Sequence, residues 1–539
     1  MLLNILVVSS EAVPLAKTGG LGDAISGMAH ALHDAGVAVS LLLPAYRSTL
    51  RHVTHLRTVG ILDDLPGGTA QLLAGRIVKT GVPVILLRND TLYERDGSLY
   101  LDAHGKEYPD NGIRFAALSH AAVRIAEGRT TLPVPHVVHA NDWHAGLVPM
   151  LMHARGVTNV RSVLTIHNLA FQGIFPMEQA ESLGIPLEYR GADAAEYWGQ
   201  LNFLKAGLLF ADRITTVSHQ YATEILTPRF GMGLEGVLSS RKARLSPTPN
   251  GIDPQVWNPS NDAYLPDVYS VADLAGKASC KRALQEDVGL IANPNATVMV
   301  SCSRLTSQKM GDVAAQAIPR ALAAHPDLQV AVLGCGDRGI EDAMREVARQ
   351  FPGRMAVHIG YDERRAHLLY AGGDILLHGS RFEPFGLAPV YAMVYATLPI
   401  CSRVGGMVDT VSDPGPQAGP NAMEHATGIL FDGETMEDML AAIDRTMALR
   451  KHPQLWWSMQ RNGMLSRFNW ETSAHRYLDL YAQMVDAHVT VPRPFKSMIA
   501  PVASPPVKPA VNADLWSVTQ RRDKKLGTGL LRARPAPSL

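Results

Sequence analysis

A lysine- and glycine-rich segment near the amino terminus is the first part of the sequence that could do chemistry. Lys17-Thr-Gly-Gly-Leu-Gly-Asp23 lies between an apolar run and a helical pattern. The adjacent glycines Gly19 and Gly20 permit close backbone approaches, and free N–H groups at a helix start suit a phosphate or sugar oxygen. A simple tight turn is the alternative. The lysine precedes the glycines and no GKS or GKT follows, so the segment is not a P-loop.

Two cations in Arg304-Leu-Thr-Ser-Gln-Lys309 could converge on one anion. A diphosphate leaving group accumulates negative charge as its bond breaks, and fixed cations stabilise that charge. Two solvated surface cations are the alternative. The sequence has no DxD-like metal triad, so we expect neither a metal site nor a cofactor.

A glutamate and a glycine pair follow apolar runs in the second half of the chain. Glu383, within Ser380-Arg-Phe-Glu-Pro-Phe-Gly-Leu387, lies between an aromatic residue and a proline, and its carboxylate could accept hydrogen bonds from sugar hydroxyls. Gly405 and Gly406 offer a close backbone approach to phosphate. Each segment could also be only a turn.

Two further polar segments, His139-Ala-Asn-Asp142-Trp-His144 and Thr165-Ile-His167-Asn168, also end apolar runs. A metal site built on the first segment would lack an HExxH pattern. Asp142 and His167 fall where strands of a sheet present ligand groups. Neutral polar side chains beside Trp143 suit a carbohydrate better than a hydride donor.

A glycine pattern at mid-chain, Gly334-Cys-Gly-Asp-Arg-Gly339, fits G-x-G-x-x-G and invites a dinucleotide-binding interpretation. The acidic residue expected about 20 positions later on the ribose is missing, because position 354 is Arg. A nucleotide-facing loop or a simple turn is the favoured reading, and an NAD-dependent oxidoreductase stays a distant alternative.

The elements that must position these residues alternate between short β-rich runs and helical patterns, which predicts two α/β domains with parallel sheets covered on both faces. The pattern breaks near Pro247–Pro254, and the domain boundary falls near residues 250–275. Ligands of such sheets bind beyond the carboxyl ends of the strands, and a cleft between domains is a favoured site. The expected strands are Ile5–Val8, Val39–Leu43, Val82–Leu87, His136–His139, Ser162–Ile166 and Arg213–Val217, then Thr297–Ser301, Gln329–Leu333, Met355–Ile359, Ile375–His378, Pro399–Ser402 and Gly428–Phe431.

Composition narrows the class of protein further. The 539 residues include 50 basic and 50 acidic side chains, and hydrophobic residues make up 46% of the chain. This excludes a wholly disordered protein, and zero net charge gives no global field for nucleic acid or an anionic membrane. The four cysteines form no CxxC pattern, and no apolar run of about 18 residues is present. We expect a cytoplasmic protein.

The last segment, residues 491–539, differs from the rest. It contains eight prolines, nine Lys or Arg and two Asp, a net charge of +7 that leaves −7 for residues 1–490. A solvated, disordered tail is the favoured interpretation, and a docking arm for an acidic partner or a polyanion is the alternative.

Taken together and in this order, the motifs resemble those of bacterial glycogen synthases and plant starch synthases. The resemblance covers roughly residues 3–485 and leaves out the basic tail. It rests on Lys17–Asp23, Asn141–Gly146, Thr165–Gly173, Phe203–Gly207, Phe230–Gly236, Asn250–Asp253, Arg304–Lys309 and Ser380–Leu387.

The resemblance implies a GT-B fold of two Rossmann-like domains facing a cleft. Residues 1–250 would form the glucan acceptor side and 251–470 the nucleotide-sugar donor side, with 471–490 as a helix that crosses back. It implies transfer of an α-glucosyl group from ADP-glucose to the non-reducing end of an α-1,4-glucan, with retention at the anomeric carbon. We expect no nucleic acid or membrane partner.

The resemblance also implies roles for individual residues. Lys17 contacts the nucleotide sugar, with Gly19 and Gly20 beside it. Arg304 and Lys309 bind the diphosphate, and Glu383 holds the glucose. Further implied site residues are His167 and Asp142 near the reacting carbon, Asn250 near the glucose or acceptor, Tyr391 at the second position of a Glu-x7-Glu pattern, and Gly405 and Gly406 near phosphate.

Some positions depart from the family pattern. Phe385 replaces a cysteine, Met310 replaces a glycine, and Val404 stands where threonine is common. These changes surround the donor phosphate and base, so they bear on the choice of nucleotide. A UDP-glucose-preferring enzyme is therefore an alternative. A transferase to a small acceptor and a catalytically idle glycogen-binding protein are separate alternatives.

Overall fold

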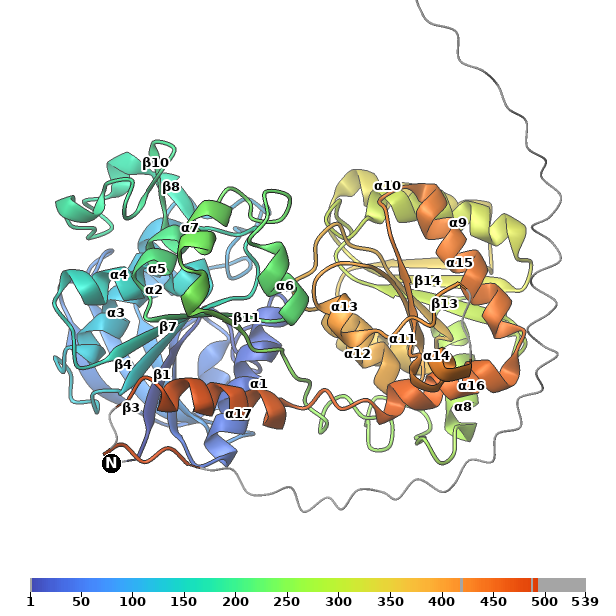
Figure 1. Cartoon of the computed structure of the whole chain (residues 1–539), viewed down its shortest axis with the longest axis horizontal. Coiled ribbons are helices and arrows are strands. Elements are labelled where there is room, and N and C mark those ends of the chain that lie inside the picture. The colour runs from blue at the N-terminus through green and yellow to red at the C-terminus, as the bar shows by residue number, and fades with distance from the viewer. Residues whose placement is uncertain (1, 417–419, 486–487, 493–539) are drawn as a thin grey trace, which may run out of the picture. The chain divides into compact units, whose positions relative to one another are not determined.

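The computed structural model describes residues 2–416, 420–485 and 488–492. Two large β-sheets with flanking helices make up this part of the chain (Figure 1). The predicted basic tail lies almost wholly outside the described residues. Within the described residues, no helix is long and apolar enough to span a membrane.

The first sheet has the strand order β12-β11-β7-β6-β1-β2-β5-β4-β3. From β12 to β5 the neighbouring strands are parallel, as the sequence predicts, but β3 and β4 are antiparallel additions at one edge. The sheet is therefore mixed rather than wholly parallel. Its strands are β1 (Asn4–Val8), β2 (Ala38–Pro44), β3 (Val53–Leu62), β4 (Ala70–Ile77), β5 (Pro83–Arg88), β6 (Val137–Asn141), β7 (Arg161–Ile166), β11 (Arg213–Thr216) and β12 (Leu245–Pro247).

The second sheet is parallel throughout, with the order β15-β14-β13-β16-β17-β18. Renumbered along the chain this is 3-2-1-4-5-6, the order of a doubly wound Rossmann sheet. Its strands are β13 (Thr297–Cys302), β14 (Leu328–Gly334), β15 (Met355–Ile359), β16 (Ile375–His378), β17 (Leu398–Ser402) and β18 (Ile429–Phe431).

Each sheet has a switch point, where consecutive connections leave in opposite directions. In the first sheet it lies between β1 and β6, and in the second between β13 and β16. Loops after such strands form the crevice in which doubly wound sheets bind ligands. The Lys17 segment and Asp142 follow β1 and β6, and the Arg304–Lys309 segment and Glu383 follow β13 and β16.

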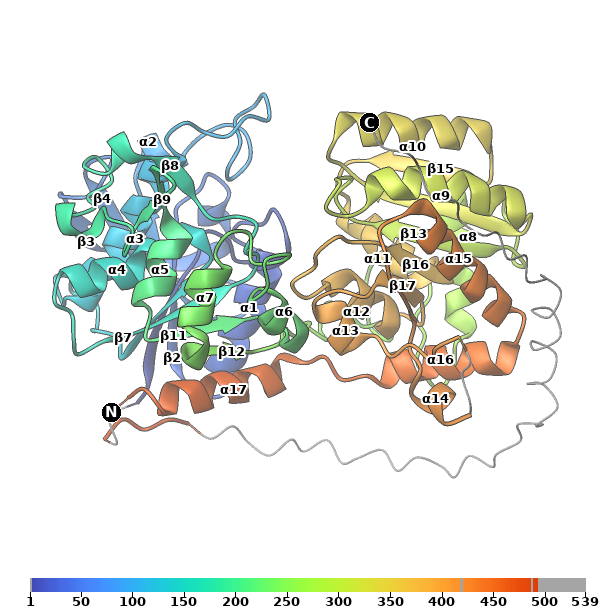
Figure 2. The same ribbon diagram turned by 45° about the horizontal axis from the view of Figure 1, so that its top comes forward.

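The helices cover the sheets, as Figure 2 shows from a second side. In the first half they are α1 (Gly20–Asp34), α2 (Asp90–Tyr93), α3 (Asn111–Ala126), α4 (Leu147–Ala154), α5 (Phe203–Phe210), α6 (His219–Glu224) and α7 (Glu235–Ser240). In the second half they are α8 (Ala275–Val288), α9 (Gly311–Ala324), α10 (Arg338–Gln350), α11 (Glu363–Gly372), α12 (Leu387–Val394), α13 (Gly406–Thr410), α14 (Pro420–His425), α15 (Met436–Arg450), α16 (Pro453–Leu465) and α17 (Trp470–Ala482).

The last helix, α17, packs against α1 and the first sheet rather than the second. Trp470, Tyr477 and Tyr481 belong to the same buried cluster as β1 and α1. Gly27 of α1 has no side chain for a clear reason: a Cβ there would lie 1.9 Å from Nε1 of Trp470. A short antiparallel sheet, β8 (Ile174–Pro176), β10 (Gln200–Asn202) and β9 (Glu196–Tyr197), adds to the first half.

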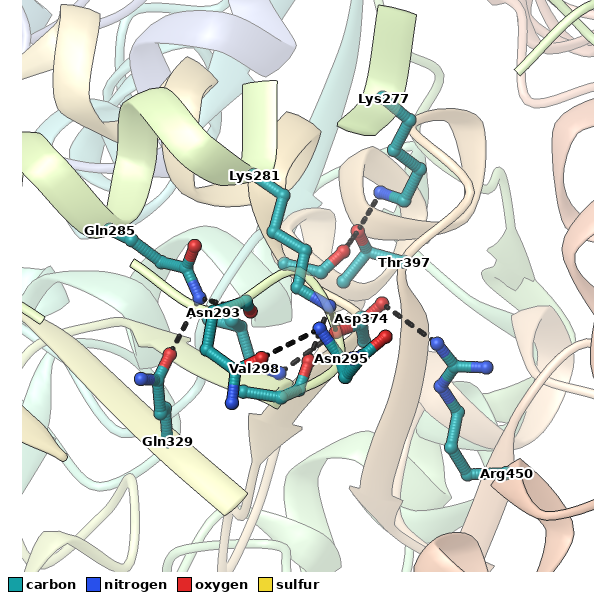
Figure 3. A network of polar contacts seen from close by, with 12 residues as sticks. Lys277, Lys281, Gln285, Asn293, Asn295, Val298, Gln329, Asp374, Thr397 and Arg450 are labelled. Atoms are coloured by element: carbon teal, nitrogen blue, oxygen red, sulfur yellow. Dashed lines mark hydrogen bonds and ion pairs between the residues drawn. The ribbon is translucent and has the colours of Figure 1, made fainter. Parts of the chain in front are cut away.

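Two buried lysines of α8 tie the second half together (Figure 3). Lys281 donates to Asp374 Oδ2 at 2.8 Å, and the same carboxylate oxygen accepts from the Val298 N–H of β13 at 2.8 Å. Lys277 donates to the carbonyls of Ala371 and Tyr395 at 2.9 and 2.8 Å. These carbonyls lie at the carboxyl ends of α11 and α12, where a cation is favoured by the helix dipole.

Candidate active site

The Lys17 segment forms the expected connection between β1 and α1, and part of its backbone is held by a side chain of the protein itself. The N–H groups of Thr18 and Gly19 donate to Oε2 of Glu11 at 2.7 and 3.3 Å. These two amides are therefore taken by Glu11, whereas the N–H groups of Gly20, Leu21 and Gly22 at the start of α1 have no acceptor among the described residues, so their use by a phosphate or sugar oxygen stays a prediction. Gly19 is extended, with φ −160°, and a Cβ there would meet nothing within 4 Å.

The Lys17 ammonium is another group of this segment that a ligand could contact. Its Nζ lies 3.1 Å from Oδ2 of Asp23 and 3.9 Å from Oε2 of Glu363. Burial raises the pKa of Asp23, and the Lys17 cation opposes that shift. A ligand anion would replace partly exposed carboxylates as the partner of Lys17.

Asp142 adopts an uncommon backbone conformation directly after β6. Its φ is 53°, in a region that residues other than glycine rarely occupy. Its Oδ1 accepts the N–H groups of His167 and Asn168 at 2.7 and 3.3 Å. Burial raises the pKa of Asp142 to about 7. The side chain thus holds the loop after β7 through Oδ1, while Oδ2 has no hydrogen-bond donor among the described residues.

His167 is a neutral imidazole whose tautomer is set by Asn141. The Asn141 amide nitrogen donates to the carbonyls of Val8 and His139 at 3.2 and 3.1 Å, so its Oδ1 must face the histidine. His167 Nε2 lies 3.0 Å from that oxygen and therefore carries the proton. Burial lowers the pKa of His167 to about 3, which leaves Nδ1 as an acceptor near neutral pH.

Aromatic rings line the region next to this histidine. Trp143 stacks on His144 with a centroid distance of 4.0 Å, and His144 stacks on Tyr100 at 4.8 Å. The metal alternative for this segment is not supported by the contacts, because His139 binds Tyr481 Oη at 2.7 Å and Thr165 Oγ1 at 2.6 Å.

Glu383 is a buried carboxylate with one oxygen fully engaged. Oε2 accepts from Lys309 Nζ, from His378 Nε2 at 3.2 Å and from Ser380 Oγ at 3.1 Å. Burial alone would favour the neutral acid, but Lys309 and His378 hold the pKa of Glu383 far below its usual range. Oε1 has no hydrogen-bond donor among the described residues. An ionised carboxylate with one free oxygen is suited to accept a sugar hydroxyl.

Arg304 and Lys309 lie on the same loop but have different partners. Lys309 pairs with Glu383, whereas the exposed Arg304 donates to Oε1 of Gln308 at 3.1 Å. The loop therefore presents one cation fixed beside Glu383 and one exposed cation. Convergence of the two on a single anion remains a prediction.

The glycines Gly405 and Gly406 are required by the protein's own backbone. A Cβ on Gly405, whose φ is 47°, would lie 1.7 Å from the Glu383 carbonyl, and one on Gly406 would lie 2.3 Å from the Phe385 carbonyl. The Gly405 N–H donates to Glu224 at 2.9 Å. The glycines thus bring this turn under the Glu383 loop, in addition to any contact with phosphate.

The mid-chain pattern Gly334–Gly339 has a similar explanation. A Cβ on Gly334 would lie 1.9 Å from the Ser303 carbonyl, and one on Gly336 would lie 2.4 Å from the Leu305 carbonyl. The glycines let this loop pack against the start of the Arg304 loop. This removes the structural reason for a dinucleotide site here.

The predicted site residues Tyr391 and Asn250 differ in burial. Tyr391 of α12 is buried and stacks on Trp257 with centroids 3.9 Å apart. Asn250 follows β12 and is half-buried. The carbonyl of the preceding residue, Pro249, accepts a hydrogen bond from the Ser473 hydroxyl of α17.

The backbone conformation of Met310 explains why glycine is usual at this position. It precedes α9 with φ 51°, a conformation that favours glycine. Its side chain is fully buried, and the Ser402 hydroxyl donates to its sulfur at 3.4 Å. Phe385 is likewise buried, in the core cluster of the second half.

Sequence reasoning missed Glu11, Asn141 and His378, which orient the predicted residues. Each lies at or just beyond the carboxyl end of β1, β6 or β16, the position that marked the other candidates. That positional signal was present, but residue type alone did not separate these side chains from core polar residues.

Two doubly wound sheets, each with candidate polar and charged residues after the strands at its switch point, are the architecture of a glycosyltransferase of the GT-B class. The sequence matches two family profiles, described as starch synthase catalytic domain over residues 4–240 and glycosyl transferases group 1 over residues 286–461. It is 54% identical to a glycogen synthase of Bordetella petrii, over 89% of this chain and 92% of the relative. A glycogen synthase of Ralstonia nicotianae is 50% identical, over 94% of each chain. The chain belongs to this family of glycogen and starch synthases.

Solved structures agree with the assignment of fold. The catalytic domain of starch synthase IV from Arabidopsis thaliana, bound to ADP and acarbose, superposes with a TM-score of 0.81 at 27% identity. The match covers 90% of this chain and 99% of that domain. A sucrose-phosphate synthase from Thermosynechococcus elongatus, 19% identical with a TM-score of 0.55, shares the fold.

Proposed function

We propose that the protein extends an α-1,4-glucan by transferring an α-glucosyl group from ADP-glucose to its non-reducing end. The relatives named glycogen synthase and the ADP-bound starch synthase support this reaction. The observation that carries it is Glu383, an ionised buried carboxylate whose Oε1 has no donor among the described residues. A glucose hydroxyl is the partner that such an oxygen lacks.

In this proposal the second sheet binds the donor. Lys309 and Arg304 bind the diphosphate and stabilise the charge that develops on departing ADP, each donor contributing on the order of 3 kcal/mol at the transition state. Gly405 and Gly406 lie near the phosphate, and Tyr391 supports the donor side through its stack on Trp257.

The first sheet supplies the acceptor side. Lys17, with Gly19 and Gly20 beside it, contacts the nucleotide sugar. The neutral His167, held by Asp142, lies near the sugar hydroxyls and the reacting carbon, and its Nδ1 can accept but not donate a hydrogen bond. Asn250 lies near the glucose or the acceptor.

Retention follows in this proposal from attack on the same face as the departing phosphate. A double displacement needs a carboxylate nucleophile at the anomeric carbon. The two carboxylates that this proposal places near the glucose already have roles: Asp142 Oδ1 accepts two backbone N–H groups, and Glu383 Oε2 is paired with Lys309 while its Oε1 accepts a glucose hydroxyl. The leaving phosphate is the remaining base for the acceptor hydroxyl.

The proposal extends to organisation and location. Residues 1–250 form the acceptor side, 251–470 the donor side, and 471–490 return to the first domain. The enzyme acts in the cytoplasm on a nucleotide sugar and a glucan. A UDP-glucose preference is the second candidate, because Phe385, Met310 and Val404 depart from the family pattern around the donor.

Incubation with ADP-[14C]glucose and glycogen tests the reaction directly. We expect label in the polymer, released by digestion of α-1,4 linkages, with ADP formed in equal amount. A parallel assay with UDP-[14C]glucose ranks the two donors. Absence of label from the polymer with either donor, in protein shown to be folded, would contradict the proposal.

A further inference from the structure

The carboxylate of Glu11 lies between the Lys17 segment and the aromatic rings of the first domain. It is buried, with 3% of the residue exposed, and has no cation partner among the described residues. A buried carboxylate without a cation costs several kcal/mol unless hydrogen bonds compensate its charge. The four hydrogen bonds that the Glu11 carboxylate accepts therefore indicate its role in the structure.

Three of these bonds hold the segment next to Lys17, two of them through its backbone. Oε2 accepts the N–H groups of Thr18 and Gly19, and Oε1 accepts the Thr18 hydroxyl at 2.6 Å. These groups immediately follow the lysine and precede α1. The direction in which Lys17 leaves the backbone thus depends on Glu11.

The fourth bond leads to the ring stack. Tyr100 Oη donates to Glu11 Oε1 at 2.6 Å and accepts from the Ser10 hydroxyl at 2.8 Å. The Tyr100 ring stacks on His144, which stacks on Trp143. Burial and the Glu11 charge both raise the pKa of Tyr100, so the phenol stays protonated and remains a donor.

We propose that Glu11 is a positioning residue that couples the Lys17 segment to the ring stack Tyr100–His144–Trp143, so that occupation of the acceptor side sets the lysine for the donor. The inference rests on the proposed function, in which the first sheet supplies the acceptor side and Lys17 contacts the nucleotide sugar, and it adds that this ring stack lies against the glucan. Coupling of this kind would limit donor hydrolysis, because a bound acceptor would further order a Lys17 segment that the Glu11 hydrogen bonds already hold.

Tyr100→Phe is the sharpest test, since it removes one hydrogen bond to Glu11 and keeps the ring. Initial rates are measured over a grid of ADP-glucose and maltohexaose concentrations. In the wild type we expect the KM for ADP-glucose to fall as maltohexaose rises. In Tyr100→Phe that dependence disappears, and the KM at saturating acceptor rises about tenfold, the loss expected for a hydrogen bond to a charged group.

Ser10→Ala is the matched control, because it removes the other hydrogen bond of the Tyr100 hydroxyl and leaves Glu11 intact. It should retain the wild-type dependence, and all variants should keep the wild-type Tm within a few degrees. The ratio of ADP-glucose hydrolysis to transfer should rise in Tyr100→Phe and in Glu11→Gln. Equal dependence in Tyr100→Phe, Ser10→Ala and wild type would overturn the coupling, as would a wild-type KM that ignores the acceptor.

A binding measurement separates this inference from the proposed reaction. Calorimetric titration with ADP should show weaker binding in Glu11→Gln than in wild type, whether or not the protein transfers glucose. Unchanged ADP affinity in Glu11→Gln overturns the positioning role. Complete lack of transfer in all folded variants, with ADP affinity altered as stated, contradicts the proposed function and not the placement of Lys17 by Glu11.

Discussion

At the scale of single residues, the candidate site consists of charged groups that the protein has already partly satisfied. Glu383 is neutralised by Lys309, and its second oxygen stays open. Asp142 Oδ1 accepts the backbone N–H of His167 and so holds the loop that carries it. What remains for a substrate is a small number of unpaired positions, and this is how a preorganised polar site avoids reorganisation during the reaction.

Glu383→Ala and Lys309→Ala should each lower kcat at least about 100-fold, because each removes a charge from the donor site and strands its partner. The exposed Glu437→Ala on α15 is a matched control and should keep full activity. The double variant Lys309→Met/Glu383→Gln should recover part of the Tm lost by the single variants without recovering kcat. Near-normal turnover in either single variant removes that residue from the mechanism.

The activity should rise with pH through about 7, because burial raises the pKa of Asp142 to about 7 and only its carboxylate accepts both backbone N–H groups well. His167, with a pKa lowered to about 3, does not titrate in this range. Asp142→Asn keeps an oxygen acceptor and cannot ionise, so its kcat/KM profile should lack this step between pH 6 and 8. The same step in Asp142→Asn would assign the titration to another group.

At the scale of elements, glycines and helix ends decide how the loops approach one another. Gly405 and Gly334 have carbonyls of neighbouring loops where a Cβ would be, while Gly19 faces open space. Glycine at positions 405 and 334 is therefore explained by the fold. The described residues give no steric reason for glycine at Gly19, and a close approach of the donor there stays a prediction.

Gly405→Ala and Gly19→Ala should separate these two reasons. Gly405→Ala should lower the Tm strongly, because the new Cβ meets the Glu383 carbonyl and φ is 47°. Gly19→Ala should leave the Tm unchanged but lower kcat/KM for ADP-glucose about tenfold or more, if the donor passes over this turn. Full activity in Gly19→Ala would remove Gly19 from the binding site.

Lys277 links α8 to the ends of α11 and α12, and burial lowers its pKa to about 7. In the unfolded chain its pKa returns to about 10.4, so between these values the unfolded state binds more protons and stability rises with pH by up to about 1.4 kcal/mol per pH unit. Lys277→Met should abolish this contribution to the rise between pH 7.5 and 9.5, measured by urea unfolding. The exposed Lys451→Met is the control, and an unchanged slope in Lys277→Met would show that Lys277 is not the titrating group.

At the scale of the whole molecule, the charge balance is uneven. Residues 491–539 carry +7 and the remainder −7. Glycogen is uncharged, so a basic segment gives it no long-range electrostatic attraction.

Deletion of residues 493–539 should therefore leave kcat and the KM for ADP-glucose within about twofold of the full chain. Neither donor binding nor glucosyl transfer depends on an electrostatic field from outside the site. Co-sedimentation with glycogen should also be unchanged at low and high salt. A salt-dependent loss of glycogen binding on deletion would instead favour a docking role for this segment.

The sequence by itself determined the chemistry and most of the framework. Apolar runs located the parallel strands of both sheets except β12, because buried strands need continuous hydrophobic segments and β12 is short, half-buried and ends at Pro247. The polar residues that follow those runs identified Lys17, Asp142, His167 and Glu383 as candidates. The antiparallel pair β3 and β4 was missed because β3 is largely exposed and lacks that signal.

Only the tertiary structure decided how these residues are used. Which amides are free, which histidine nitrogen carries the proton and which carboxylate oxygen is open depend on partners far away in the sequence, such as Glu11 with Tyr100 and Lys309 with Glu383. Strand pairing brings such partners together, and no local pattern encodes that distance. The tertiary structure thus turned a list of reactive side chains into a site in which Glu383 and Asp142 each have an oxygen without a donor, His167 is neutral, and Glu11 holds the segment that carries Lys17.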